Sequence, residues 1–213
     1  MYPPPPTSCS RSATLKSTQS SSQIVHHALD VKGWLASPPT AESARPKMCV
    51  VCGEASRPVG GGLGLHGHGF RDRQVRGPLD PDSAPAWVVI ACRRYACTAC
   101  DAILTVVPRG VAPRRHYGHA AIAMALTLWA IVDAPIAEVR RRVCAWPITD
   151  ESSTRWPALE RWARAARDAI GDASLSLVAA AGRAGQIAIG RAPPDVRDAP
   201  RWAQAFAGGS AMP

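Results

Sequence analysis

Two Cys-x-x-Cys pairs constrain the fold of this chain more than any other feature of its sequence. The first lies in "CVVCGE" and the second in "RRYACTAC", and together they supply Cys49, Cys52, Cys97 and Cys100. Four soft thiolates can close a tetrahedron around Zn²⁺, and each pair suits a tight turn whose backbone amides face the sulfurs. The 44 residues between the pairs exceed the usual ribbon spacing, but an inserted hairpin lengthens the loop without moving its ends. The sequence therefore predicts one structural zinc ion per chain.

Two other uses of these cysteines are weighed against structural zinc. A redox Cys-x-x-Cys is expected at the start of a helix within a βαβ pattern, and neither pair has that setting. A Cys₂His₂ finger would be built from the second pair and two nearby histidines, Cys97, Cys100, His116 and His119. However, the histidine spacing in "HYGH" is too short, and Pro108 and Pro113 interrupt the helix that such a finger needs.

The remaining cysteines and histidines of this region do not form a catalytic pattern. Cys92 falls among strand residues and Cys144 near the end of an amphipathic helix, so both are expected to be small buried side chains. His66 and His68 alternate on one predicted strand and are expected at the surface or facing nucleic acid. No catalytic residue is predicted, and the chain is not expected to be an enzyme.

The chain divides by composition into four regions of an α+β protein. Residues 1–46 are expected to be a disordered N-terminal region with a short helix at 22–36. The zinc ribbon is assigned to 47–113 and a helical, DNA-binding-like domain to 114–190, followed by a flexible tail at 191–213. This organisation predicts a small β unit that precedes a helix-turn-helix-like bundle.

Periodicity assigns the elements within these regions. Residues 66–76 and 86–96 are predicted as two strands joined by the turn-rich "GPLDPDSAP", because the second is dense in β-branched and aromatic side chains. From residue 117 onward the pattern is helical, and the expected helices are 117–132, 135–145, 154–170 and 173–189.

Charge points to a polyanionic partner. The chain has 25 Lys and Arg against 16 Asp and Glu, a net charge of +9, and arginine supplies most of it. Such a surplus usually favours nucleic acid or a membrane surface. The longest apolar stretch, residues 120–132, is too short to span a bilayer, and no secretory signal is visible. We therefore expect a cytoplasmic protein with DNA rather than a membrane as partner.

The helix expected from Arg155 has the pattern of a packed helix with a basic outer face. Its apolar stripe contains Trp156, Leu159, Ala163, Ala166 and Ile170. Thr154 is suited to cap this helix and Pro157 to its first turn. Arg161 and Arg164 project from the other side of the helix and are predicted to read DNA bases.

Four segments resemble a bacterial family of transposase-associated zinc-ribbon proteins, similar to the N-terminal region of insertion-sequence transposases. They are "CVVCG", "HGHGFRDRQVRGP", "RRYACTACDAILTVVPRGVAPRRHYG" and "RWPALERWARA", within residues 24–170. The resemblance implies a zinc ribbon followed by a helix-turn-helix-like segment that binds DNA.

Three functions from different classes remain open at this point. The first is a DNA-binding module, either a stand-alone accessory protein or the recognition half of a transposase. The second is an active transposase, which would need several carboxylates on a sizeable sheet after the recognition region. The third is a zinc adaptor that binds a transposase or another protein. For the first, the expected nucleic-acid contacts are Arg93, Arg94, Arg114, Arg115, Arg155, Arg161 and Arg164.

Overall fold

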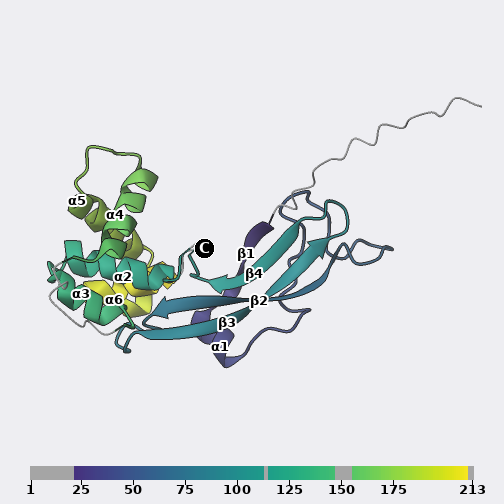
Figure 1. The fold of residues 1–213 in the computed structure, drawn as a ribbon, viewed down its shortest axis with the longest axis horizontal. Helices are drawn as coiled ribbons and strands as arrows, with labels where there is room; N and C mark the ends of the chain where they lie inside the picture. Colours follow the sequence, from purple (N-terminus) through teal and green to yellow (C-terminus); the bar gives the residue numbers. More distant parts are fainter. Residues whose placement is uncertain (1–21, 113–114, 147–154, 211–213) are drawn as a thin grey trace, which may run out of the picture.

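The structure, a computed structural model, describes residues 22–112, 115–146 and 155–210. It is α+β, as expected, with one four-stranded sheet and a group of helices gathered at one end of that sheet (Figure 1). The strands, in sheet order, are β1 (Ser22–Asp30), β4 (Ile103–Arg109), β3 (Ala86–Cys97) and β2 (Leu65–Gly77). β1 and β4 are parallel, and the other neighbours are antiparallel. The predicted β2–β3 hairpin is confirmed.

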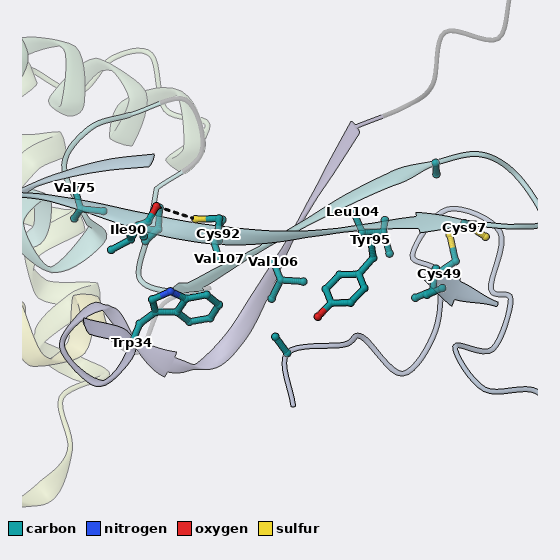
Figure 2. Close-up of a cluster of buried hydrophobic side chains, with 14 residues drawn as sticks. Trp34, Cys49, Val75, Ile90, Cys92, Tyr95, Cys97, Leu104, Val106 and Val107 are labelled. Carbon is teal, nitrogen blue, oxygen red and sulfur yellow. Dashed lines mark hydrogen bonds between the residues drawn. The ribbon is translucent and has the colours of Figure 1, made fainter. Parts of the chain in front are cut away.

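The two faces of the sheet differ in what covers them. Residues directly opposite in neighbouring strands share a face, and successive residues of one strand alternate between faces. Tyr95 and Leu104 are opposite one another on the face that α1 (Val31–Ala36) and the segment after it cover. There Trp34 is 2% exposed and lies on the same side of the sheet as Tyr95 (Figure 2). Its indole N–H donates to the Ala91 carbonyl, and the Tyr95 hydroxyl donates to the Ala41 carbonyl.

The other face, here called the groove face, carries basic and small side chains. By strand register it includes Arg71 opposite Cys92, Arg94 opposite Thr105, and Ile24 beside Thr105. Arg73, two residues after Arg71, lies on it too.

The helices are α2 (His119–Ala130), α3 (Ile136–Val143), α4 (Pro157–Ile170), α5 (Leu177–Gly190) and α6 (Arg201–Ser210), with a 3₁₀ turn η2 (Pro194–Val196). α2 is apolar nearly all round, which predicts a central position, and it contacts each of the other α-helices of this group. Its Met124 and Leu128 belong to a core separate from that of the sheet. None of the helices in the described part of the chain is both long and apolar enough to cross a bilayer.

The apolar stripe expected on α4 is buried only in its first half. Leu159 and Ala163 are buried as predicted, whereas Ala166 and Ile170 are half-exposed. Pro157 occupies the first turn, while the proposed cap Thr154 lies outside the described residues. The bulkiest core residue of this helix, Trp162, stands outside the predicted stripe and packs edge-on against Tyr117 and Trp156.

The helix expected over residues 22–36 is wrong for most of its length. Ser22–Asp30 is a strand that pairs with β4, and the helix is confined to Val31–Ala36, where Asp30 caps it by accepting from the Gly33 N–H. The expected disorder is therefore wrong from residue 22 onward, since Trp34 and Ala44 are both buried. Residues 1–21 lie outside the described part of the chain.

The flexible tail expected from residue 191 is wrong over α6, which packs against α2 and α5. Phe206 of α6 is buried in the helical core. Two consecutive glycines, Gly208 and Gly209, permit this contact: a Cβ on Gly208 would stand 1.8 Å from the Ala188 carbonyl oxygen, and one on Gly209 2.9 Å from the Ala120 Cα. A pair of glycines is typical of a helix end, but here the two glycines lie within α6 and allow it to pack closely against its neighbours.

Candidate metal centre and basic groove

The two Cys-x-x-Cys pairs meet at the end of the sheet far from the helices (Figures 1 and 2). The sulfur atoms of Cys49, Cys52, Cys97 and Cys100 all lie within 4.8 Å of one another. Between the pairs, the sulfurs of Cys49 and Cys100 are 3.7 Å apart and those of Cys52 and Cys97 3.6 Å apart. These separations are too long for a disulfide of about 2.05 Å, but they match the ~3.8 Å between thiolates bound tetrahedrally at ~2.3 Å from a metal. The four cysteines can therefore hold one metal ion.

Both pairs form the same kind of turn. The Gly53 N–H donates to the Cys49 carbonyl at 2.9 Å, and the Asp101 N–H donates to the Cys97 carbonyl at 3.0 Å. Each of these first cysteines also donates its own N–H to the carbonyl five residues later, at 2.8 and 3.0 Å respectively. Both turns close on a left-handed residue, with φ of 77° at Gly53 and 58° at Asp101. This repeated geometry aims the two cysteines of each pair at the same point.

The environment of the sulfurs favours a bound cation. Burial alone would raise the pKa of Cys49, but hydrogen bonds from the Cys52 and Val51 amides lower this pKa to about 7. The Ala102 amide favours the Cys100 thiolate, yet burial and the adjoining sulfurs outweigh it and raise the pKa of Cys100 to about 12. The four sulfurs therefore do not all ionise at neutral pH unless a cation stabilises their charge.

Ion pairs of Glu42 and contacts of Arg45 connect the turn at Cys49–Gly53 to the rest of the sheet. Glu42 pairs with Arg45 at 3.2 Å and with Arg57 at 2.8 Å, so it joins the segment before the turn to the segment after it. The Arg45 guanidinium also donates to the Leu65 carbonyl and lies 5.4 Å from the centre of the Tyr95 ring. These contacts fix where residues 47–64 begin and end on the sheet.

The alternatives for the cysteines find no support in this geometry. Neither pair stands at the start of a helix, as a redox Cys-x-x-Cys would. His116 precedes α2 and His119 is its first residue, and neither belongs to the sulfur group; Cys92 does not belong to it either. Cys92 is buried, as predicted, and burial raises the pKa of its thiol to about 11. Cys144 is also buried, where its sulfur accepts from the Tyr117 hydroxyl at 3.4 Å.

A second candidate site is a groove of about 540 Å³ on the groove face of the sheet. Arg71 and Arg73 of β2 line one side of it, and Arg115 and His116 line another, with Asp72 as its one acidic residue. Arg73 is half-buried and donates to the Ala112 and Arg115 carbonyls, and it thereby holds the segment that carries Arg115 against the sheet. The floor is formed by small and apolar side chains: Ser22, Ile24, Cys92 and Thr105.

The arginines expected to bind nucleic acid are dispersed over the molecule. Arg94 lies on the groove face, and Arg115 lines the groove itself. Arg93, the neighbour of Arg94, points to the opposite face, where it donates to the Pro39 carbonyl at 2.9 Å and stacks 4.7 Å from the centre of the Phe70 ring. Arg114 lies outside the described residues.

The arginines of α4 differ from those of the groove in their partners. Arg155 and Arg164 both form ion pairs with Glu160, at 3.4 and 3.2 Å. Arg161 is exposed and makes no ion pair within the described part of the chain. α3 ends at Val143 and α4 begins at Pro157, a longer connection than the three- or four-residue turn of a helix-turn-helix.

Arg71 and Arg73 are not among the residues predicted from the sequence to bind nucleic acid, although the sequence contains a signal for them. In "RDRQVR" the two arginines alternate with Asp72 and Gln74 within a predicted strand, which places them on one face. Arg115 and His116 line the groove only because their loop folds back over that face. The alternation of residues along a strand does not predict the position of such a loop. His66 and His68 are exposed on β2, as expected, and neither lines the groove.

No protein-family model, curated protein or solved structure matches this chain.

Proposed function

We propose that this protein is a zinc-stabilised DNA-binding module that contacts the DNA backbone with the groove face of its sheet. We also propose that the protein is related to the recognition region of transposases. The proposal assigns the chain a recognition role and no catalytic step. Strand joining needs several carboxylates around Mg²⁺, and the one group of three or more potential metal ligands in the described residues consists of cysteines.

The arginines of the groove face carry the proposal. Arg71, Arg94 and Arg115 have no ion-pair partner within the described residues, whereas Arg141 and Arg142 pair with Glu138, as Arg155 and Arg164 pair with Glu160. Each of these glutamates offsets one of the two arginine charges it pairs with and holds both guanidinium groups, while an unpaired guanidinium is available to phosphate. Unpaired arginines drawn from two strands and a loop to one face form a cationic surface suited to a polyanion.

Zinc has a structural role in this proposal. Four thiolates fill a tetrahedral zinc site, so no position remains for a water or a substrate. When bound, the ion supplies charge neutralisation and cross-linking to the end of the sheet. The cysteines join β3 and β4 to residues 47–64, and β3 also carries Arg94.

The test is the salt dependence of binding to a labelled random duplex, measured by fluorescence anisotropy. Each arginine that neutralises a phosphate contributes roughly 0.9 to the slope of log affinity against log salt concentration. The triple variant Arg71→Gln, Arg94→Gln, Arg115→Gln should therefore reduce the slope by about 2 to 3. The double variant Arg155→Gln, Arg164→Gln is the control and should change the slope by less than about 1, because Glu160 offsets one of the two charges and holds both side chains.

Two results would contradict the proposal in different ways. If Arg161→Gln flattens the slope and the triple groove variant does not, DNA is bound by α4 and the groove face is the wrong surface. If the parent protein binds neither duplex nor single-stranded DNA at low salt, the DNA-binding function itself is wrong and the adaptor function is favoured.

A further inference from the structure

A second groove lies among the helices, and Arg115 lines both this groove and the one on the groove face of the sheet. It has a volume of about 590 Å³ and is lined by α2, the second half of α4 and the second half of α5. Its lining is mostly small and apolar, with Ala123 from α2, Ala166 and Ala169 from α4, and Ala184 and Ala188 from α5. Alanines leave the helix backbones accessible to close packing, as the contact of α6 with α5 already illustrates.

This groove is where the apolar stripe of α4 continues without a partner. The first half of the stripe packs into the helical core through Leu159 and Ala163. The second half, Ala166 and Ile170, is half-exposed and lines the groove. On the α5 side Ile187 is 45% exposed. An apolar surface contributed by two neighbouring helices and left uncovered marks an interaction site more often than a scattered apolar residue does.

The charges around the groove have one sign. Arg115, Arg183 and Arg191 line it, and no acidic side chain does. None of these three arginines has an ion pair within the described part of the chain, and Arg183 lies close enough to Asp172, in the α4–α5 connection, to affect its pKa. The pKa of Asp172 is lowered chiefly by hydrogen bonds from Ser174 and only weakly by Arg183. The rim therefore presents uncompensated positive charge beside an apolar floor.

We propose that this groove binds an amphipathic helix of another protein, one with an apolar face flanked by Asp or Glu. Such a helix would bury its apolar face against the alanines and Ile187, and its carboxylates would pair with Arg183 and Arg191. A groove between helices that is lined largely by alanine suits a helix, because the backbone of a docked helix can approach alanines closely. The proposal does not depend on DNA binding.

Charge argues against two occupants of the groove that this chain could itself supply, a second copy and the N-terminal segment. A second copy would place the same arginines against one another, and the chain carries a net charge of +9. Residues 1–21 contain Arg11 and Lys16 and no Asp or Glu, so this segment has no carboxylate to offer the rim.

The experiment uses the full chain and two synthetic peptides. The probe is a labelled, hydrocarbon-stapled helix with leucines at i, i+3, i+4 and i+7 and glutamates beside them, and its partner peptide has lysine at every glutamate position. The glutamate peptide should bind and the lysine peptide should not. Arg183→Gln and Arg191→Gln should each weaken binding about fivefold, and Ile187→Asp should abolish it.

Two control variants locate the effect. Arg197→Gln removes one exposed charge outside the groove, and Arg71→Gln removes one from the sheet face; both should bind the glutamate peptide as the parent does. Circular dichroism should verify that every variant retains its helices. Equal binding of the two peptides, or equal weakening by Arg197→Gln and Arg183→Gln, would overturn the proposal. Binding of dodecanoate without binding of the peptide would assign the groove to an acyl ligand, and self-association lost in Ile187→Asp would assign it to a second copy.

Discussion

Replacing Cys97 by serine should lower the zinc affinity of this protein by about two to three orders of magnitude. Structural zinc contributes ~10 to 16 kcal/mol at neutral pH, and four equivalent sulfurs share that energy. One quarter of it is about 3 to 4 kcal/mol, and each 1.4 kcal/mol is tenfold in affinity. Equal sharing is reasonable because the two pairs form the same turn and the Cys49–Cys100 and Cys52–Cys97 sulfur separations are nearly equal, at 3.7 and 3.6 Å.

Competition with a chromophoric chelator measures this affinity directly. Cys92→Ala is the matched control, since Cys92 lies on the same strand and is fully buried but is not one of the four clustered cysteines. The control should keep one zinc ion per chain with unchanged affinity. The assignment of ligands is refuted if both variants bind zinc equally, or if Cys92→Ala is the one that loses it.

The consequence of losing the metal should be local. In residues 47–64 the large apolar side chains Met48, Val50, Val51, Val59 and Leu63 are exposed, so this segment has almost no apolar core of its own. Its backbone hydrogen bonds contribute only about 1 kcal/mol each, together less than the ~10 to 16 kcal/mol of a structural zinc ion. Hydrogen exchange after chelation should accelerate in 47–64 and in the β3–β4 turn while α2 stays protected, because the helical core is separate. Unchanged exchange in 47–64 would show that the metal does not hold this segment.

Three further predictions concern the rest of the molecule. Gly208→Ala should lower the free energy of unfolding by about 1 to 3 kcal/mol in urea denaturation, because its Cβ would stand 1.8 Å from the Ala188 carbonyl oxygen; an unchanged midpoint would show that α6 is not docked there. Trp162→Ala should cost about 3 to 5 kcal/mol by the same assay and leave the zinc content unchanged, whereas loss of zinc would mean that the two cores are not independent. The pKa of Cys92 is raised by burial to about 11, so iodoacetamide at pH 8 should spare it in the native protein and modify it faster as the pH rises. Because the folded-state pKa is the higher one, the contribution of Cys92 to stability is present below about pH 8.5 and is lost as the pH rises toward 11; stability that does not fall over this range would contradict the burial argument.

What the sequence predicted well was local. The β2–β3 hairpin and the helices α2 to α5 each depend on a periodic pattern within one stretch of chain, and all were found close to their expected positions. The clustering of the four cysteines was predictable for a different reason. Each pair requires only a short turn, and bringing two turns together needs no knowledge of the intervening 44 residues. The donor chemistry itself implies the contact.

What the sequence did not predict depends on distant partners. Ile24, Ala28 and Val31 have helical spacing, but Ser22–Asp30 becomes a strand because the edge of β4 is available to pair with it in parallel. This parallel pairing joins residues about 80 apart in the chain, so it cannot be predicted from the local propensity of residues 22–30. Similarly, "AGGS" at the end of α6 resembles a helix end until α2 and α5 are present to pack against its glycines.

The position of the arginines explains how the net charge can act in one place. Glu138 offsets one of the two charges of Arg141 and Arg142 on α3, and Glu160 offsets one of the two charges of Arg155 and Arg164, so these arginines contribute less surplus charge than their number suggests. Alternation along β3 divides adjacent arginines between opposite faces, and it leaves Arg93 as a structural residue and Arg94 on the groove face. Since Arg94 precedes Cys97 by three residues on the same strand, the metal that would order the end of β3 would also restrict where this guanidinium can lie. Zinc binding and polyanion binding are therefore expected to be coupled through one strand.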